Sequence, residues 1–161
     1  MNGDGGRAGG PAGALTLRLA SPGDLDLIVS FENEIFAEDP WSPAMLAEEL
    51  AGASSRYTIV EASGVPCGYA GLKIGGDQAD VMTIGVLARA RGLGAGALLL
   101  DEMLAWAVEA GVREVFLDVR PSNEAALALY SSRGFAEIAR RPRYFKNPVE
   151  EAVEMRLELA R

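Results

Sequence analysis

The chain contains no histidine and a single cysteine, and these shortages exclude several common kinds of catalytic and metal site. Without histidine there can be no Ser-His or Cys-His catalytic pair, and the usual histidine-containing zinc sites are excluded too. The single cysteine, Cys67, cannot form an internal disulfide, which suits a reducing compartment. It lies in an expected strand, where we interpret it as a small buried side chain rather than a nucleophile. We therefore expect a cytoplasmic protein with no metal site.

Long apolar runs are also lacking. No stretch approaches the roughly 20 consecutive apolar residues that a membrane-spanning helix needs. The Gly/Ala-rich start, residues 1–14, has no apolar core of the kind found in secretory signals, and we expect it to be a disordered tail. Residues 15–161 are then expected to form one domain, since 161 residues are enough to bury a sizeable core.

Positive charge is scarce. The net charge of −8 argues against a nucleic-acid binder, which would need many phosphate contacts. The acidic excess lies in residues 21–62, where Arg56 is the sole basic residue. The acids there are Asp24, Asp26, Glu32, Glu34, Glu38, Asp39, Glu48, Glu49 and Glu61. They are either two solvated helix faces or a surface that attracts a cationic partner.

Hydrophobic periodicity and turn residues predict a mixed α/β domain. The expected helices cover residues 22–36, 43–51, 97–110 and 123–132. The expected strands cover residues 15–20, 56–62, 67–74, 79–86, 112–119, a stretch around Ile138, and residues 153–159. Because three consecutive strands linked by hairpins precede a helix and a further strand, the sheet should be mixed and mostly antiparallel. No acidic residue follows the glycine-rich residues 92–96 at the spacing of a dinucleotide-binding unit, which argues against that fold. The Gly-Lys-Ser/Thr of a nucleotide-binding P-loop does not occur either.

A glycine-rich turn, Arg91-Gly92-Leu93-Gly94-Ala95-Gly96, joins the strand at 79–86 to the apolar helix expected from Ala97. Glycines allow a ligand to approach the backbone closely, because no Cβ blocks it. The helix start adds unpaired N–H groups and the positive end of its dipole, which together favour a phosphate or diphosphate. The glycines could instead serve only a tight turn.

Two separated motifs resemble the GCN5-related N-acetyltransferase (GNAT) superfamily over about residues 15–159. The first is the glycine turn, which is similar to the superfamily's Arg/Gln-x-x-Gly-x-Gly/Ala. The second is Asn123-Glu124-Ala125-Ala126-Leu127-Ala128-Leu129-Tyr130, followed by Arg133-Gly134-Phe135. The resemblance implies a central sheet of about seven strands flanked by four helices, with acetyl-CoA as co-substrate and no metal.

The glycine turn fits the first motif in two registers, Arg89-x-x-Gly92-x-Gly94 or Arg91-x-x-Gly94-x-Gly96. We prefer the second, in which the helix begins with Ala97. Backbone amides from Gly92 to Ala97 would then face the diphosphate, and the backbone of Ile84 to Val86 would pair with the pantetheine arm. The acetyl-CoA contacts that the resemblance implies are Ile84, Gly85, Val86, Arg91, Gly92, Leu93, Gly94, Ala95, Gly96, Ala97 and Asn123.

Within the superfamily the chain is most similar to bacterial ribosomal-protein alanine N-acetyltransferases, the RimI type. Further shared segments are Phe36, Pro40-Trp41-Ser42, Thr83-Ile84-Gly85-Val86, Leu117-Asp118-Val119-Arg120-Pro121-Ser122-Asn123 and Arg143-Tyr144-Phe145. In that group a glutamate acts as general base where this chain has Asp118, which is one methylene shorter. Asp118 could instead be a structural partner of Arg120, with Asp80 and Glu34 as weaker candidates for the base.

Tyr130 matches the group's general acid, although it could also be a core aromatic beside Leu127 and Phe135. Asn123 could cap its own helix as well as contact CoA. Acceptor choice should depend on the first two helices, where Trp41 either lines the groove or packs on the core, and on residues 140–148. The basic strip Arg140, Arg141 and Arg143 is either a solvated face or a contact for a CoA phosphate.

The function that the resemblance implies is acetyl transfer to the N-terminal alanine of a ribosomal protein with a basic N-terminus. The expected partner is that peptide, and we expect the protein to bind neither nucleic acid nor a membrane. We expect it to be a monomer or a weak dimer. Two alternatives stay open. One is a small-amine acetyltransferase acting on polyamines, amino acids or aminoglycosides, and the other is a non-catalytic acyl-CoA-binding module.

Overall fold

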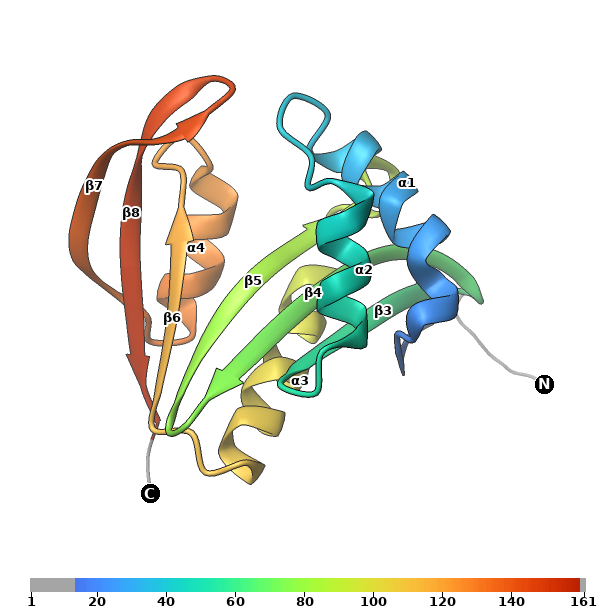
Figure 1. Cartoon of the computed structure of the whole chain (residues 1–161), viewed down its shortest axis with the longest axis horizontal. Helices are drawn as coiled ribbons and strands as arrows, with labels where there is room; N and C mark the ends of the chain where they lie inside the picture. Colours follow the sequence, from blue (N-terminus) through green and yellow to red (C-terminus); the bar gives the residue numbers. More distant parts are fainter. Residues whose placement is uncertain (1–13, 160–161) are drawn as a thin grey trace.

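The computed structural model describes residues 14–159, which form one seven-stranded sheet with helices on both faces (Figure 1). The strands are β2 (Leu15–Leu19), β3 (Ser55–Ala62), β4 (Val65–Gly75), β5 (Gln78–Val86), β6 (Glu114–Val119), β7 (Ala136–Lys146) and β8 (Val149–Glu158). The helices are α1 (Leu25–Ile35), α2 (Pro43–Ala51), α3 (Ala95–Glu109) and α4 (Glu124–Ser132), with 3-10 turns η1 (Pro22–Asp24) and η2 (Ala88–Ala90). The expected element order and fold class are confirmed. The expected tail, residues 1–14, lies outside the described residues except for Ala14.

The helix starts follow the capping signals in the sequence. The side chains of Ser21 and Asp24 form a capping box at η1, which leads directly into α1. The Ser42 hydroxyl accepts the Met45 N–H at 3.2 Å and caps α2, where Pro43 takes the first helical position. These two caps fix where the chain enters and leaves the loop between α1 and α2.

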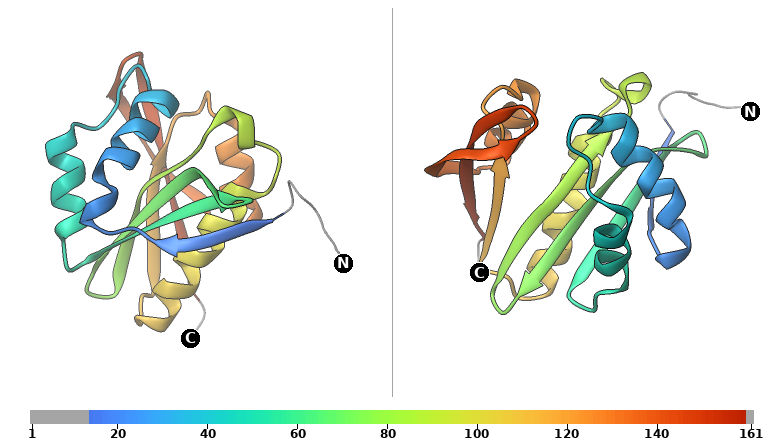
Figure 2. Two further views of the ribbon diagram at one scale, coloured as in Figure 1. Left: turned by 90° about the vertical axis from the view of Figure 1, so that its right-hand side faces the viewer. Right: turned by 45° about the horizontal axis from the view of Figure 1, so that its top comes forward.

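The sheet has the order β2-β3-β4-β5-β6-β8-β7 and contains one parallel pair, β5 with β6. That pair is short: Gln78–Asp80 lie opposite Glu114–Phe116, and no further residues of the two strands pair with each other. Beyond this point the strands diverge, so that the sheet opens between them (Figures 1 and 2). We call the space between Val81–Val86 and Leu117–Val119 the β5–β6 gap.

Each face of the sheet has its own hydrophobic core. Helices α1 and α2 cover one face, with Ile28, Phe31 and Leu46 packed on sheet residues that include Tyr57 and Tyr69. Helices α3 and α4 cover the other face with a larger cluster, which includes the buried Cys67 as expected. Within residues 14–159 no helix is long and apolar enough to span a membrane.

Three elements differ most from the expected ranges. The last strand, β8, begins at Val149 rather than at residue 153. Helix α3 begins at Ala95 rather than Ala97, because Gly94 adopts a left-handed conformation (φ +88°) and acts as the N-cap. The strand expected around Ile138 continues to Lys146. It pairs with β8 up to Arg141 and again at Phe145 and Lys146, and register shifts interrupt the pairing at Ile138 and at residues 142–144. Residues 140–146, expected to help choose the acceptor, are therefore part of an edge strand.

Candidate active site

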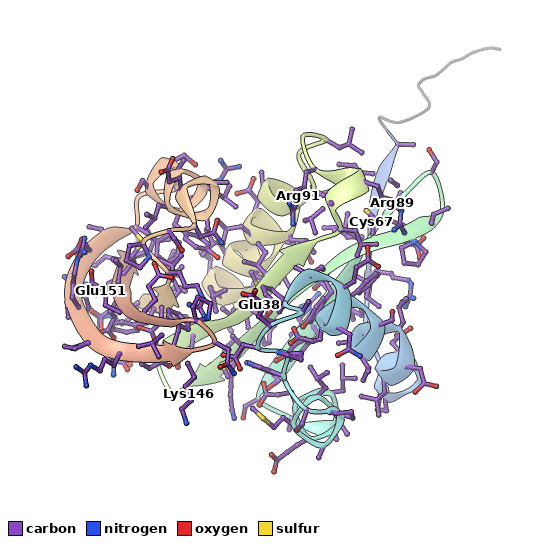
Figure 3. The ribbon with its side chains drawn as sticks, turned by 90° about the horizontal axis from the view of Figure 1, so that it is seen from above. Glu38, Cys67, Arg89, Arg91, Lys146 and Glu151 are labelled. Atoms are coloured by element: carbon purple, nitrogen blue, oxygen red, sulfur yellow. The ribbon has the colours of Figure 1, made fainter. Side chains whose placement is uncertain are left out.

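The turn between β5 and α3 presents a run of free backbone N–H groups. The first helical hydrogen bond runs from the Leu98 N–H to the Gly94 carbonyl at 3.0 Å. Among the described residues, no hydrogen bond uses the N–H groups of residues 92–97. The turn lies with the α1–α2 loop at the same end of the molecule, which Figure 3 views from above with Arg89, Arg91 and Glu38 labelled. Free amides at a helix N-terminus can bind an anion, which is the role that the sequence analysis predicts for this turn.

The backbone conformations distinguish the glycines of this turn. Gly92 and Gly94 have positive φ values of +84° and +88°, whereas Gly96 lies inside the first turn of α3. A Cβ at Gly96 would be 3.6 Å from Leu129, an ordinary contact. The two left-handed glycines are those of the register that begins at Arg89, which is the register the sequence analysis set aside. Arg89 itself lies 3.9 Å from Glu34 of α1.

Strand β5 has one open edge along the gap. Ile84, Gly85 and Val86 pair with β4 on one side, and past Asp80 no described strand pairs with β5 on the other. The β4–β5 register shifts between Gly71 and Leu72, which leaves Met82 as a bulged residue at the start of this edge. An open edge next to free amides can hold an extended chain by backbone hydrogen bonds.

Asp118 lies on β6, between Leu117 and Val119, which belong to the core on the α3 and α4 side. Its own side chain therefore lies on the α1 and α2 face of the sheet. Arg141 of β7 approaches Asp118 with its Nε 3.6 Å from Oδ1 and binds Glu154, the cross-strand neighbour, at 3.1 Å. The Tyr144 hydroxyl lies close enough to the Asp118 carboxylate to influence the pKa of both groups.

Burial raises the pKa of Asp118, and the charge of Glu154 raises it further, while Arg141 and Tyr144 oppose the shift. Its Oδ1 atom is enclosed and accepts no hydrogen bond from a described residue. Asp80, on the same face, also has a raised pKa because of burial and the neighbouring charges of Asp118 and Glu154. A carboxylate with a raised pKa and an oxygen that accepts no hydrogen bond is suited to accept a proton.

The alternative role of Asp118 as a partner of Arg120 is wrong. Arg120 instead binds Glu150 at 3.2 Å and lies over the Phe145 ring at 4.4 Å from its centroid. The partners of Asp118 come from β7 and β8, which the sequence analysis did not connect with this residue. Glu154 could have been found from the sequence. It lies between the apolar Val153 and Met155, so its side chain is expected on the opposite face of the strand from theirs.

Tyr130 of α4 lies on the opposite face of the sheet from Asp118. Its ring is 5 % exposed and meets Phe135 edge-on, with centroids 5.8 Å apart, and burial raises the pKa of its hydroxyl. The hydroxyl forms no hydrogen bond with any residue in the described range. Asn123 caps α4 by accepting the Ala126 N–H at 3.1 Å, so its expected capping role is confirmed.

The acidic stretch is less unbalanced in three dimensions than in sequence. Arg18 binds both Asp24 and Glu61, and Lys73 binds Glu49, so basic residues outside residues 21–62 neutralise part of it. Glu38 and Asp39 are exposed in the loop between α1 and α2. This loop is thus the part of the acidic stretch that faces the same end as the glycine turn (Figure 3).

Glu32 is a residue that the sequence analysis counted only as part of an acidic surface. It is 2 % exposed, and its carboxylate accepts the Trp41 N–H at 2.7 Å and the Tyr69 hydroxyl. Its spacing from Ile28 and Phe31, four and one residues before it, places it on the buried stripe of α1 and could have revealed it. Trp41 is half-buried against the same cluster, which favours the packing role of its ring.

A hollow lined by Leu17, Arg56, Thr58 and Glu102 lies elsewhere, at β2 and β3 on the α3 face. It is separated from the β5–β6 gap by β4 and contributes no residue to the arrangement above. Within residues 14–159 no group of three or more metal-ligating side chains comes together.

Comparison with known proteins agrees with this geometry. The acetyltransferase (GNAT) family matches residues 25–135. The N-alpha-acetyltransferase RimI of Mycobacterium tuberculosis is 37 % identical over 147 residues, covering 88 % of this chain and 91 % of that protein. The ribosomal protein bS18-alanine N-acetyltransferase of Escherichia coli is 29 % identical over 75 % of this chain and 82 % of its own. The crystal structure of the Escherichia coli ribosomal-protein-S18-alanine N-acetyltransferase superposes with a TM-score of 0.85 at 28 % identity, covering 92 % of this chain and 96 % of that one.

Proposed function

The chain belongs to the acetyltransferase (GNAT) family, and from this premise we propose that it acetylates the N-terminal α-amine of alanine on a ribosomal protein. The acetyl donor is acetyl-CoA, and the amine attacks it directly in a ternary complex. Support for the acceptor comes from relatives that are named for the alanine of ribosomal protein bS18. We also propose that the enzyme works in the cytoplasm, where ribosomal proteins are made.

The donor fits the free amides and the open strand edge. The diphosphate would bind the N–H groups of residues 92–97 at the start of α3, where the helix dipole favours negative charge. We propose the register with Arg89, Gly92 and Gly94, because these two glycines have the left-handed backbone. The pantetheine arm would lie along Ile84–Val86, and Asn123 would contact CoA as the resemblance implies.

The observation that carries the mechanism is that Asp118 and Tyr130 lie on opposite faces of the sheet, and we infer that both reach the β5–β6 gap. An acyl group held in the gap is then open to an amine on the α1 and α2 face. Its thiol leaving group lies toward α4 on the other face. The thiolate can take its proton from the Tyr130 hydroxyl, and a backbone N–H from Ile84 to Val86 can stabilise the oxyanion.

Asp118 has to remove a proton only from a weakly basic amine. An α-amine has a pKa of roughly 7.7–8.0, so roughly a tenth of it is neutral at pH 7. A lysine amine, with a pKa of about 10.4, costs roughly 3.5 kcal/mol more to deprotonate. A short carboxylate acting through a water molecule is therefore adequate for an N-terminus. Glu38 at the same end, with its exposed chain neighbour Asp39, suits a basic peptide.

The test is a panel of acceptors scored by CoA release and intact mass. It contains a basic peptide starting with alanine, the same peptide with a blocked N-terminus and an internal lysine, and free amines such as spermidine. We expect a gain of about 42 Da, one acetyl group, on the free α-amine alone. Tyr130→Phe should bind acetyl-CoA as the parent does and turn over far more slowly.

The exposed acids of the α1–α2 loop also favour a second candidate, an acetyltransferase for polyamines. Acetylation of free amines with no reaction on any peptide would select it and refute the proposed acceptor. Binding of acetyl-CoA with no turnover on the entire panel would instead indicate an acyl-CoA-binding module.

A further inference from the structure

Glu32 is a charged side chain in the closed core between α1, α2 and the sheet. Burying a carboxylate is costly unless hydrogen bonds compensate. Here the Trp41 N–H donates to Oε1 at 2.7 Å and the Tyr69 hydroxyl donates to Oε2. Burial still raises the pKa of Glu32, against the opposing effect of the two hydrogen bonds. An apolar residue of similar volume would cost less here, so packing alone does not explain this glutamate.

The polar contacts of Glu32 continue through Tyr69 to strand β5. The Thr83 side chain lies close enough to the Tyr69 hydroxyl to lower its pKa, against the larger raising effect of burial. Thr83 follows the bulged Met82 and precedes Ile84, the first residue of the open strand edge. One connected set of polar groups thus joins α1, the loop at Trp41, β4 and β5.

Two neighbouring aromatic rings hold the side chain of Tyr69 in place. Its ring stacks between Phe31, with centroids 6.0 Å apart, and Tyr57, at 6.3 Å. Strand β5 also packs closely against the end of α1 at Gly85, where a Cβ would be 3.1 Å from the side chains of Ile35 and Phe36. A shift of the loop would therefore break the Glu32 contacts rather than be absorbed by the core.

We propose that Glu32 and Tyr69 are positioning residues that fix the α1–α2 loop over strand β5, so that the acceptor amine meets the acetyl group in line. This inference rests on the proposed function, since it assigns the loop to the acceptor. The two residues act through Trp41 and Thr83 and have no chemical step of their own. Their loss should weaken acceptor use and leave the diphosphate site at the start of α3 intact.

The chain offers a matched control in Tyr57. Tyr57 and Tyr69 are both buried tyrosines of the same cluster, and each donates its hydroxyl hydrogen to a glutamate. The Tyr57 hydroxyl, however, binds Glu49 of α2 at 2.8 Å, and within residues 14–159 it forms no hydrogen bond with the loop or with β5. Tyr57→Phe and Tyr69→Phe each remove one buried oxygen, and only the second breaks the connection to Glu32.

The experiment compares Tyr69→Phe, Tyr57→Phe and Glu32→Gln in the full chain. We expect Tyr69→Phe and Glu32→Gln to raise the KM for an alanine-initiated basic peptide about tenfold, the effect of losing a hydrogen bond to a charged group. The Kd for acetyl-CoA, measured by calorimetry, should stay within twofold of the parent. Tyr57→Phe should leave both constants near the parent values, and melting temperatures show that each variant is folded.

Two results would overturn the inference. One is a Tyr69→Phe peptide KM no different from that of Tyr57→Phe, and the other is an equal loss of acetyl-CoA binding. Hydrogen exchange of residues 37–42 decides the point without turnover: it should accelerate in Tyr69→Phe and not in Tyr57→Phe. A parent chain that acetylates no peptide refutes the proposed function, while this exchange comparison still tests the positioning role.

Discussion

Replacing Gly94 with alanine tests whether the left-handed turn forms the diphosphate site. Because both registers contain Gly94, the comparison with Gly96→Ala decides between them. Gly94 has φ +88° with no atom within 4 Å of the position of a Cβ, so the change adds backbone strain without a clash. A non-glycine residue in this conformation costs roughly 1–2 kcal/mol. If the turn relaxes to relieve the strain, binding has to restore it, which raises the Kd for acetyl-CoA by about 5- to 30-fold.

Gly96→Ala is the matched control, two residues further along. Gly96 is helical, its Cβ would make an ordinary 3.6 Å contact with Leu129, and alanine favours a helix by roughly 0.5–1 kcal/mol over glycine. We expect a slightly higher melting temperature and an unchanged Kd. Calorimetry with acetyl-CoA and with CoA measures both variants. A Gly96→Ala defect larger than that of Gly94→Ala would refute the register that starts at Arg89.

Three further outcomes follow from the two faces of the gap. Tyr130→Phe should lower kcat by about 10²-fold or more, the usual contribution of a general acid, with acetyl-CoA affinity unchanged in a titration. Asp118→Asn should lower kcat yet raise the melting temperature at neutral pH. The sign follows because a raised carboxyl pKa stabilises the fold only below the unfolded pKa, and this contribution is lost as pH rises. Activity should fall as pH decreases through the raised pKa of Asp118. Arg141→Gln removes a cation that lowers this pKa, so it should move the acidic limb of the kcat profile to higher pH. A limb that stays in place would exclude Asp118 as the base.

Most of the fold could be predicted because its signals are local. The cap at Ser42, the Gly64 and Gly76 turns and the alternation of the strands each depend on a few neighbouring residues. The predicted start of α3 was wrong by two residues. Gly92, Gly94 and Gly96 are each two residues apart, and either consecutive pair could end the turn. Backbone conformation decided between them, and the sequence does not state it.

The partners of the catalytic candidates could not be predicted in the same way. Asp118 and Arg141 are 23 positions apart, and they meet because β8 lies between β6 and β7 in the sheet. The sequence instead suggested Arg120, two residues away, which turns to Glu150. Pairings between strands depend on sheet order and register, and a register shift on β7 placed Arg141 within reach.

The short parallel pairing of β5 with β6 accounts for the whole arrangement of the site. A continuous sheet would separate a base on one face from an acid on the other by a layer of backbone. Because the two strands stop pairing after Asp80, the proposed thioester position lies where a strand is missing, with one candidate group on each face of the sheet. In this proposal the acceptor amine and the leaving thiol lie on different faces of the sheet. The Asp118 carboxylate and the Tyr130 hydroxyl therefore lie in different surroundings. Asp118 stays among charged partners on β7 and β8, and Tyr130 stays in an apolar core, so that their different proton affinities follow from the sheet that separates them.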